Sequence, residues 1–324
     1  MVRTILALLA FGAIAMPAAS HAQAWPSKPV RMVVGFAAGG NTDIVARVLA
    51  ARMQEITGQA VVVENKTGLG GVIGTDTVAK SAPDGYTLLM QSTGPHAIAP
   101  FLLGKQKVPY DPVVDLAPVS NVAFNALALM VHPSVPAKSV RDLVDYAKAN
   151  PGKLNFGSSG IGATSHLSGE ILKAMTGVNV VHVPFRGGNQ ATAAMLAGEV
   201  QFMFANLSDA LPQLKGGKLQ VLGVTTQKRQ PQAPDLPTLA EAGIAGFDVA
   251  PWNGIVAPGK TPPELVNQIS ALIQRVTHEP AFVAKMTEIG SQPIGDTPAE
   301  FRKTVDFELA RWSKLIREAG IKAD

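Results

Sequence analysis

Short apolar runs alternate with segments of helical periodicity through most of this chain. The runs at residues 30–36, 60–64 and 86–90 are typical of buried strands, and the pattern at 44–57 predicts a helix. Glycine-rich turns separate these elements, including the segments 37–43 and 65–74. Strands that alternate with helices in this way predict a mostly parallel sheet covered on both faces.

The same rhythm restarts in the middle of the chain. Strands are predicted at 126–131, 154–156, 178–183, 200–204 and 219–225. Helices are predicted at 139–149, from about 166 to 175, and at 190–197, with Ser139 as the N-cap of the first. The chain therefore reads as two α/β domains, with residues 25–122 and 248–324 in the first and residues 123–247 in the second. Neither crossing, near 120 and 245, resembles a flexible Pro/Ser-rich linker.

The C-terminal part is predicted to be mostly helical, over residues 262–277, 281–289 and 298–319. Thr297, Pro298 and Glu300 form a capping-box pattern with proline at the first helical position. Apolar residues then recur at helical spacing and predict one stripe that docks on the first domain. The stripe consists of Phe301, Val305, Leu309, Trp312 and Ile316.

The N-terminus has the three parts of a secretory signal peptide. Arg3 precedes an apolar run over 5–15, which is followed by Pro17 and by small residues up to Ala24. The run is too short to span a bilayer core, which takes about 20 residues. We expect residues 1–24 to be removed and the mature protein to be exported to the periplasm, with cleavage after Ala24 and Ala22 as the alternative site.

Composition excludes several classes of function. The 28 Lys and Arg residues slightly outnumber the 24 Asp and Glu residues, but they are scattered and form no basic stripe, so we expect no nucleic-acid partner. The chain has no cysteine, which excludes disulfides, thiol catalysis and cysteine–zinc sites. The histidines show no metal-ligand spacing, and His166 is expected to pack or cap a helix. No catalytic constellation, metal or cofactor is predicted.

One segment, Gly-Ile-Val-Ala-Pro-Gly-Lys-Thr at 254–261, matches the phosphate-binding pattern G-x-x-x-x-G-K-T. Its context argues against that interpretation, because Pro258 removes a loop N–H and Pro263 would break a helix begun at Gly259. We instead expect the end of a strand, a turn, and a helix with Thr261 as N-cap, Pro262 at its first position and Glu264 in a capping box.

Two other loops have the features of an anion site. Residues 35–43 and 157–165 each follow a predicted strand, are rich in glycine and in polar side chains, and open a helix. Such loops offer free backbone N–H groups at the positive end of the helix. Either loop alone is also compatible with a plain strand–helix turn. Their occurrence as a pair, one in each domain, favours a carboxylate held between two lobes.

Motifs along nearly the whole mature chain resemble one known family. They include the segments WPSKPVRMVVGFAAGGNTDIVAR, GQAVVVENKTGLGG, PDGYTLL, GSSGIGATSHLSGE, HVPFRGG and WNGIVAPGKTPPELV. In order and spacing these are similar to the periplasmic substrate-binding receptors of tripartite tricarboxylate transporters, the TctC or Bug-type proteins. The resemblance implies a two-lobed periplasmic-binding-protein fold that closes like a Venus flytrap on a small organic carboxylate. It also implies transient membrane permease partners, a monomeric receptor and no cofactor.

The resemblance also implies where the ligand binds. In the family, one ligand carboxylate lies between the two loops and is held by backbone N–H groups, hydroxyls and waters. Here the matching positions of those loops are Gly39, Gly40, Asp43, Ser158, Ser159, Gly162 and Thr164. The other end of the ligand would meet more variable positions, namely Ser92, Thr93, Phe185, Arg186, Asn206 and Asp209.

This chain departs from the family pattern at several of these loops. Gly35 and Ala38 replace common prolines, Ala163 replaces a common serine, and Phe185-Arg186 replace a common Tyr-Lys pair. Arg186 either pairs with a second ligand carboxylate or is a solvated surface side chain. The ligand stays open among citrate, short dicarboxylates, amino acids and aromatic acids. Two other functions also stay open: a receptor that feeds a sensor kinase, and an exported enzyme on the same scaffold.

Overall fold

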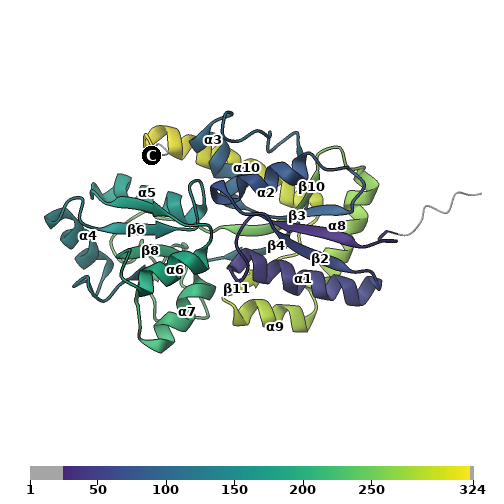
Figure 1. The fold of residues 1–324 in the computed structure, drawn as a ribbon. Helices are drawn as coiled ribbons and strands as arrows, with labels where there is room; N and C mark the ends of the chain where they lie inside the picture. Colours follow the sequence, from purple (N-terminus) through teal and green to yellow (C-terminus); the bar gives the residue numbers. More distant parts are fainter. Residues whose placement is uncertain (1–24, 322–324) are drawn as a thin grey trace, which may run out of the picture.

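The computed structural model describes residues 25–321, and the predicted signal peptide lies outside the described residues. These residues form two lobes, each a mixed sheet flanked by helices (Figure 1). The first lobe has the strand order β11-β4-β10-β3-β1-β2, and the second has the order β7-β6-β8-β5-β9. The predicted two-lobed α/β fold is confirmed.

The first lobe is built from six strands and the helices around them. Its strands are β1 (Val30–Val34), β2 (Val61–Asn65), β3 (Thr87–Ser92), β4 (Leu116–Asn125), β10 (Trp252–Pro258) and β11 (Ser291–Pro293). Its longer helices are α1 (Asn41–Thr57), α2 (Val72–Ala79), α8 (Pro263–Thr277), α9 (Pro280–Glu288) and α10 (Pro298–Glu318). Its short helical turns are η1 (Leu69–Gly71), the π-helical η2 (Gly94–Ile98) and α3 (Ala99–Leu103).

The second lobe has five strands and four helices within the described residues. Its strands are β5 (Leu127–Val131), β6 (Asn155–Ser158), β7 (Val181–Pro184), β8 (Phe202–Asn206) and β9 (Gln220–Val224). Its helices are α4 (Val140–Ala149), α5 (Thr164–Thr176), α6 (Gly188–Leu196) and α7 (Leu207–Gly216). The chain passes between the lobes at Ala126 and again between β9 and β10. The predicted domain boundaries, 122/123 and 247/248, stay predictions.

The direction of the strands reflects these two crossings. The parallel pairs join β1 to β2 and β3, and β6 to β7 and β8. Every antiparallel pair contains β4, β5 or β10, the strands that adjoin the crossings. Strand–helix–strand units inside a lobe produce parallel neighbours. A strand that arrives from the other lobe has no such connection, so both sheets are mixed. The prediction that the sheets are mostly parallel is therefore wrong, because two of five pairs in the first sheet and two of four in the second are parallel.

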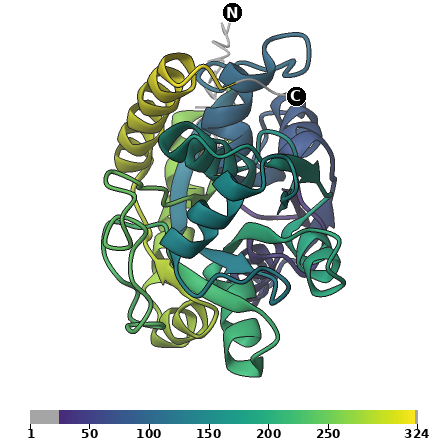
Figure 2. The ribbon, with the colours of Figure 1, turned by 90° about the vertical axis from the view of Figure 1, so that its left-hand side faces the viewer.

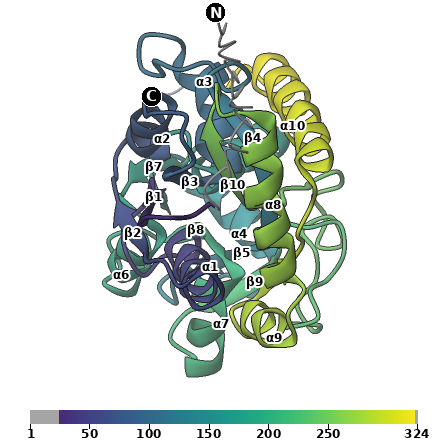
Figure 3. The same cartoon turned by 90° about the vertical axis from the view of Figure 1, so that its right-hand side faces the viewer.

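Alternation along the strands of the first lobe places side chains on two faces of the sheet. Met32 and Val34 of β1 pack with α1, α8 and α9, whereas Val33 packs with α2 and α10 on the opposite face. The strands are apolar almost throughout because both faces are covered. Figure 3 shows α8 and α10 near each other beside β4, and both helices contact this strand. No helix within residues 25–321 is long and apolar enough to cross a membrane.

The C-terminal helix begins and packs as predicted. The Thr297 hydroxyl accepts a hydrogen bond from the Glu300 N–H at 3.3 Å, and the Glu300 carboxylate accepts from the Thr297 N–H at 2.9 Å. All five residues of the predicted stripe are buried.

Helix α10 also reaches the second lobe, because Leu315 lines a hollow together with Ile171 and Met175 of α5. Arg311 lies 3.2 Å from the Asp248 carboxylate, in the crossing between β9 and β10. This helix therefore contacts both lobes. Figure 2 shows the molecule from the side of the second lobe.

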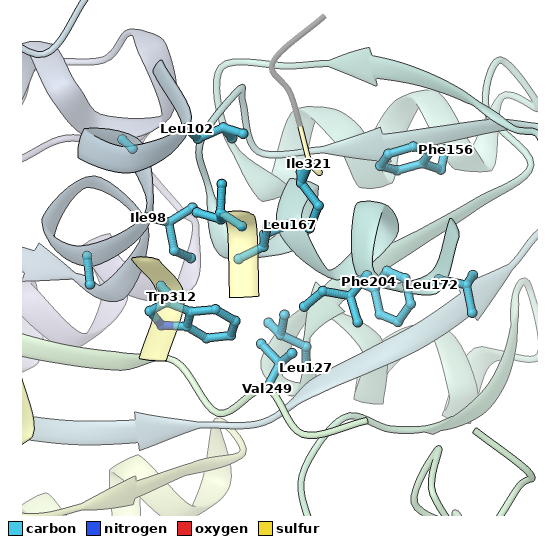
Figure 4. Close-up of a cluster of buried hydrophobic side chains, with 14 of the residues drawn as sticks. Ile98, Leu102, Leu127, Phe156, Leu167, Leu172, Phe204, Val249, Trp312 and Ile321 are labelled. Atoms are coloured by element: carbon cyan, nitrogen blue, oxygen red, sulfur yellow. The ribbon is translucent and has the colours of Figure 1, made fainter. Parts of the chain in front are cut away.

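A hydrophobic cluster continues from one lobe into the other beside α10. Figure 4 shows Ile98 and Leu102 of the first lobe near Leu167 of the second, with Trp312 and Ile321 beside them. All of these side chains belong to one buried cluster. Because an apolar side chain gains about 1.5–3 kcal/mol from full burial, this shared core stabilises the closed arrangement of the lobes.

The segment that resembles a phosphate-binding loop has a structural role. Strand β10 covers Gly254 and ends at Pro258, and the Gly259 N–H then donates to the Asp115 carbonyl at 2.8 Å. A Cβ atom at Gly259 would lie 2.0 Å from the Val114 carbonyl oxygen. Glycine is therefore required at 259 by close backbone packing, and the expected strand and turn are present.

The predicted start of the next helix is wrong by one residue. Helix α8 begins at Pro263, its N-cap is Pro262, and no side chain caps it. The Thr261 hydroxyl donates to the Pro258 carbonyl at 2.7 Å instead of accepting from the first turn of the helix. The expected capping box with Glu264 therefore does not form, because Thr261 is used to close the preceding turn.

Glycine residues bring the two lobes into backbone contact. A Cβ atom at Gly70, in the first lobe, would lie 2.3 Å from the Ile161 carbonyl oxygen and 2.9 Å from the Ala163 nitrogen of the second. A Cβ atom at Gly160 would in turn lie 3.0 Å from the Gly70 nitrogen. The lobes are thus closed on each other in the structure, and a side chain at this seam would push them apart.

We expect Gly70→Ala to hold the lobes apart. Gly58→Ala is the matched control, because both glycines have a left-handed φ, of 60° and 68°, and a Cβ atom at Gly58 would meet nothing within 4 Å. In both variants the free energy of unfolding falls by about 1–2 kcal/mol, because alanine disfavours the left-handed conformation. Gly70→Ala alone should lower the free energy of unfolding by more than this, as measured by chemical unfolding. It alone should also increase the radius of gyration measured by small-angle X-ray scattering. If both variants lost the same stability and scattering were unchanged, glycine at position 70 would not be needed for the lobes to close.

We also expect Thr297→Ala to lower the free energy of unfolding by about 1 kcal/mol through loss of the capping box. Thr304→Ala is the control in the same helix, because the Thr304 hydroxyl donates only to the Glu300 carbonyl at 3.4 Å. Urea unfolding of both variants measures the difference. An unchanged midpoint for Thr297→Ala would show that the cap contributes nothing.

Candidate functional site

A cavity of about 50 Å³ lies between the lobes. Its walls come from the loop after β1, from β3, from both crossings, and from the loops after β6 and β8. The lining residues are Phe36, Gly40, Asn41, Thr42, Ser92, Asn125, Leu127, Ser159, Ala163, Thr164, Ser165, Gly188, Met203, Phe204, Ala205, Asn206, Asp209, Pro251 and Asn253. The cavity is large enough for ordered water or a small polar group.

Four helices begin at the wall of this cavity. They are α1 from the first lobe and α5, α6 and α7 from the second, and their N-caps are Gly40, Ala163, Gly187 and Asn206. None of these four N-caps makes a side-chain capping hydrogen bond. The N–H groups of Leu207 and Gln190 are bound to the Ala126 carbonyl and the Asn189 side chain. Other backbone N–H groups in the first turns are available to an anion, and the four helix dipoles favour negative charge here.

A network of amide and hydroxyl side chains forms the floor of the cavity. The buried Asn41 accepts a hydrogen bond from Asn253 at 2.8 Å, and the Thr42 hydroxyl donates to the same Asn253 side chain at 3.1 Å. Ser291 donates to Asn125 at 2.6 Å and accepts from Asn41 at 3.2 Å. Asn125 ends β4 and Asn253 lies in β10, so this network joins helix α1 to both strands that lead to the crossings.

Two hydrogen bonds cross between the lobes near the cavity. The Asn41 amide donates to the Ser208 hydroxyl at 3.2 Å, and the Asn189 amide donates to the Ala38 carbonyl at 2.8 Å. Each bond links a loop at the start of α1 to the start of α7 or α6. Closure therefore assembles the cavity from elements of both lobes.

Six of the residues predicted to bind ligand line the cavity. They are Gly40, Ser92, Ser159, Thr164, Asn206 and Asp209. The Ser159 hydroxyl lies 2.9 Å from the Ser165 hydroxyl. The Thr164 hydroxyl makes no hydrogen bond within the described residues, and its side chain is nearly buried. These residues come from both predicted loops and from β3 and β8, as the sequence indicated.

Other predicted residues lie beside the cavity and shape its loops. The Gly39 N–H and Arg47 each donate to the Asp43 carboxylate at 2.8 Å, as does Asn65. Although burial opposes its ionisation, these hydrogen bonds hold the pKa of Asp43 below its usual value. Gly39 has a φ of 81°, which explains a glycine there. Asp43 thus fixes the first loop from behind.

Thr93, Ser158 and Gly162 also make internal contacts. The Thr93 hydroxyl accepts from the Trp252 N–H at 3.0 Å, and the Gly162 N–H donates to His166 at 3.2 Å. Ser158 lies 2.6 Å from Nε2 of His182 and accepts from the Gly160 N–H. The predicted packing role of His166 agrees with its burial and its stacking on His182, with ring centroids 4.0 Å apart.

The Ser158–His182 contact joins the residue types of a catalytic nucleophile and a base, but a ligand in the cavity cannot reach the Ser158 hydroxyl. The Ser158 side chain is fully buried and does not line the cavity. Burial, His166 and Lys173 lower the pKa of His182 to about 3. The pair is therefore a structural hydrogen bond that supports the second loop.

Phe185 and Arg186 line a separate hollow at the seam between the lobes. It has a volume of about 180 Å³ and is also lined by Gly70, Gly160 and Ser159. Ser159 is shared with the main cavity, so the two hollows are neighbours. The backbone N–H of Arg186 donates to the Gln190 side chain at 3.3 Å. The structure does not bring Phe185 or Arg186 to the wall of the main cavity.

Several cavity residues were missed by sequence reasoning. Phe36, Asn41, Thr42 and Ser165 stand inside or beside the two predicted loops, but their side chains gave no separate signal. Asn125 and Asn253 come from the crossings. An isolated asparagine next to a predicted crossing between lobes is the signal that would have found them.

The cavity wall carries very little charge. Among residues 25–321, Asp209 is the only ionisable side chain in this wall, because the other lining residues include no Lys, Arg, His, Glu or Tyr. Burial raises the pKa of Asp209 to about 6, and hydrogen bonds from Asn206 and Ser208 partly offset this rise. Within residues 25–321 no group of three or more His, Cys, Asp or Glu side chains is placed to hold a metal ion. An anion in the cavity would therefore be held by helix ends, amides and hydroxyls.

Comparisons with known proteins agree with this architecture. A model of the tripartite tricarboxylate transporter family receptor matches residues 45–321. The protein BugT of Bordetella pertussis is 35% identical over 317 residues, which cover 97% of this chain and 95% of BugT.

Three solved structures share the fold. Rpa4515 of R. palustris, solved with adipate, is 38% identical to this chain with a TM-score of 0.88. The match covers 92% of this chain and 99% of the Rpa4515 chain. The periplasmic binding protein BugD is 35% identical with a TM-score of 0.87, and the coverage is 93% and 100%. MatC of Rhodopseudomonas palustris, solved with malate, is 32% identical with a TM-score of 0.86, and the coverage is 90% and 100%. This chain therefore belongs to the tripartite tricarboxylate transporter receptor family and has the two-lobed fold of periplasmic binding proteins.

Proposed function

We propose that this protein is a periplasmic receptor that captures a small organic carboxylate between its lobes and delivers it to the membrane permease of a tripartite tricarboxylate-type transporter. The observation that carries the proposal is the convergence of four uncapped helix N-termini on one interlobe cavity. A carboxylate there accepts hydrogen bonds from first-turn N–H groups and from hydroxyls such as that of Thr164.

The ligands of related structures support the chemical class. Rpa4515 was solved with adipate and MatC with malate, and both molecules are carboxylates. Closure removes such a ligand from solvent, and differential affinity for the closed state drives the closure. The predicted export and the predicted permease partner rest on the N-terminal sequence pattern and on the family. A receptor that feeds a sensor kinase remains the alternative, and a pull-down with membrane partners separates the two.

A catalytic role has less support from the cavity. Its hydroxyl residues include Ser92, Ser159 and Thr164, but no histidine or lysine base lines the wall with them. The Ser158–His182 pair is buried elsewhere. We therefore propose binding without turnover.

Thermal-shift screening of an organic-acid library tests the proposed function. A ligand at one hundred times its Kd adds about 2.7 kcal/mol of stability, so the true ligand should raise the Tm by several degrees. Nuclear magnetic resonance of the same mixtures should show the acid unchanged after incubation. A library that shifts no midpoint would overturn carboxylate binding, and conversion of the acid would overturn the receptor role.

We expect Thr164→Val to weaken binding of the identified acid by about 10- to 100-fold, because a hydrogen bond to a charged group contributes about 1.5–3 kcal/mol. Valine preserves the shape of the threonine side chain. Thr176→Val is the control on the same helix, since Thr176 lies at its other end and its hydroxyl donates to the Leu172 carbonyl. Isothermal titration calorimetry measures both. Equal affinities for the two variants would place the carboxylate away from Thr164.

A further inference from the structure

Asp209 lines the cavity and has one carboxylate oxygen without a hydrogen-bond partner among the described residues. It stands in the first turn of α7, and its Oδ2 atom is closed off from solvent and has no hydrogen-bond partner within residues 25–321. Its Oδ1 atom lies 3.5 Å from the Ser208 hydroxyl, at the limit of a hydrogen bond. The Asn206 side chain also hydrogen-bonds the carboxylate. The residue as a whole is half-buried, and it lines the cavity.

The packing around this carboxylate keeps other groups away from it. A Cβ atom at Gly188, the first residue of α6, would lie 3.0 Å from Oδ2 of Asp209. Glycine therefore leaves room for the carboxylate against the start of α6. The Gly188 position offers a backbone but no side-chain donor, and the Asp209 side chain lines the cavity beside it.

No positive charge from the surrounding elements compensates Asp209. Helix α7 packs against β5, β8, β9 and α6, and none of these four elements contains Asp, Glu, Lys, Arg or His. On α7 itself the other charged residue is Lys215, in the last turn. Across the cavity, α1 contributes Asp43, which is already bound to Arg47. Burial without a counter-ion raises the pKa of Asp209 to about 6.

A buried carboxylate oxygen without a donor is costly, and proteins keep such groups paired. In the proposed carboxylate receptor, a bound ligand supplies a donor to this carboxylate. A second ionised carboxylate would instead place like charges side by side, which is unfavourable when water is excluded. Contact with Asp209 would therefore favour ligands that have a hydrogen-bond donor in addition to the bound carboxylate over ligands that have a second carboxylate.

We propose that Asp209 accepts a hydrogen bond from a hydroxyl or ammonium group of the ligand, so that the preferred ligand is a hydroxy or amino acid and a simple dicarboxylate is disfavoured. This inference rests on the proposed function and adds the chemical class of the substrate. It assigns Asp209 the role of a specificity-determining residue next to the carboxylate held by the helix ends.

The test compares ligands of equal length on two proteins. Calorimetry at pH 7.5 measures the affinity for each ligand. The four-carbon set compares 4-hydroxybutyrate and 4-aminobutyrate with succinate, and matching sets have three, five and six carbons. The 2-hydroxy and 2-amino acids of the same lengths complete the panel. Wild type is compared with Asp209→Asn, and Asp306→Asn serves as the control because Asp306 is exposed on α10. We expect the tightest wild-type ligand to carry a hydroxyl or ammonium group and to bind at least tenfold better than the dicarboxylate of its length.

Asp209→Asn should then lower the affinity for that ligand at least tenfold and reduce its preference over the dicarboxylate, whereas Asp306→Asn changes neither. A dicarboxylate that binds tightest and is unaffected by Asp209→Asn would overturn the inference but leave the receptor function intact. If no acid in the panel or in the wider library binds, the carboxylate-receptor function fails and the inference fails with it.

A second measurement separates this role from a structural one. Because the folded-state pKa of Asp209 lies above its usual value, protonation stabilises the fold at low pH and this contribution is lost as the pH rises through about 6. Asp209→Asn should therefore raise the Tm of the ligand-free protein at pH 8 and raise it less at pH 5. A lower Tm for the variant at both pH values would show that Asp209 already has a protein partner, which contradicts the proposed role.

Discussion

The site depends on the positive ends of four helices that meet at one cavity. Each helix end contributes about 0.3–1 kcal/mol to a nearby anion, and up to about 2 kcal/mol where it is partly buried. One end comes from the first lobe and three come from the second. Neither lobe alone assembles the full set, so the affinity for an anion is coupled to closure. The wall needs no lysine or arginine, and it has none.

Closure in turn depends on backbones that approach across the seam. Gly70 and Gly160 meet there, and Gly94 packs on the backbone of Gly162 and Ala163, with a Cβ–Cα distance of 3.1 Å if a Cβ were present. Side chains at these positions would hold the helix ends away from the cavity. The glycines at this seam thus let the lobes touch, whereas the N–H groups of Gly39, Gly160 and Gly162 are bound within their own loops.

The sequence predicted the elements with strong local signals. Ser139 and Thr297 cap their helices as expected, and most strands lie within a few residues of their predicted positions. Strand β4 gave a weaker signal because Pro118, Ser120 and Asn121 interrupt its apolar pattern. Helix α7 contains Pro212, which disfavours a helix in any sequence-based argument. The antiparallel strands were also beyond local patterns, because their direction is set by the crossings between lobes.

The candidate site was predictable to the level of its loops but not of its individual side chains. Asp43 and Asp209 illustrate the difference, since each stands in the first turn of a helix. Asp43 accepts hydrogen bonds from Gly39, Arg47 and Asn65, and its pKa is lowered. Asp209 has an unpartnered oxygen, and its pKa is raised. Helical spacing alone brings Arg47 and Gly39 to Asp43, but Asn65 comes from β2, and the burial of Asp209 comes from the helices and strands around it. Only the fold therefore shows that, within the described part of the chain, the protein satisfies the first carboxylate and leaves one oxygen of the second without a donor.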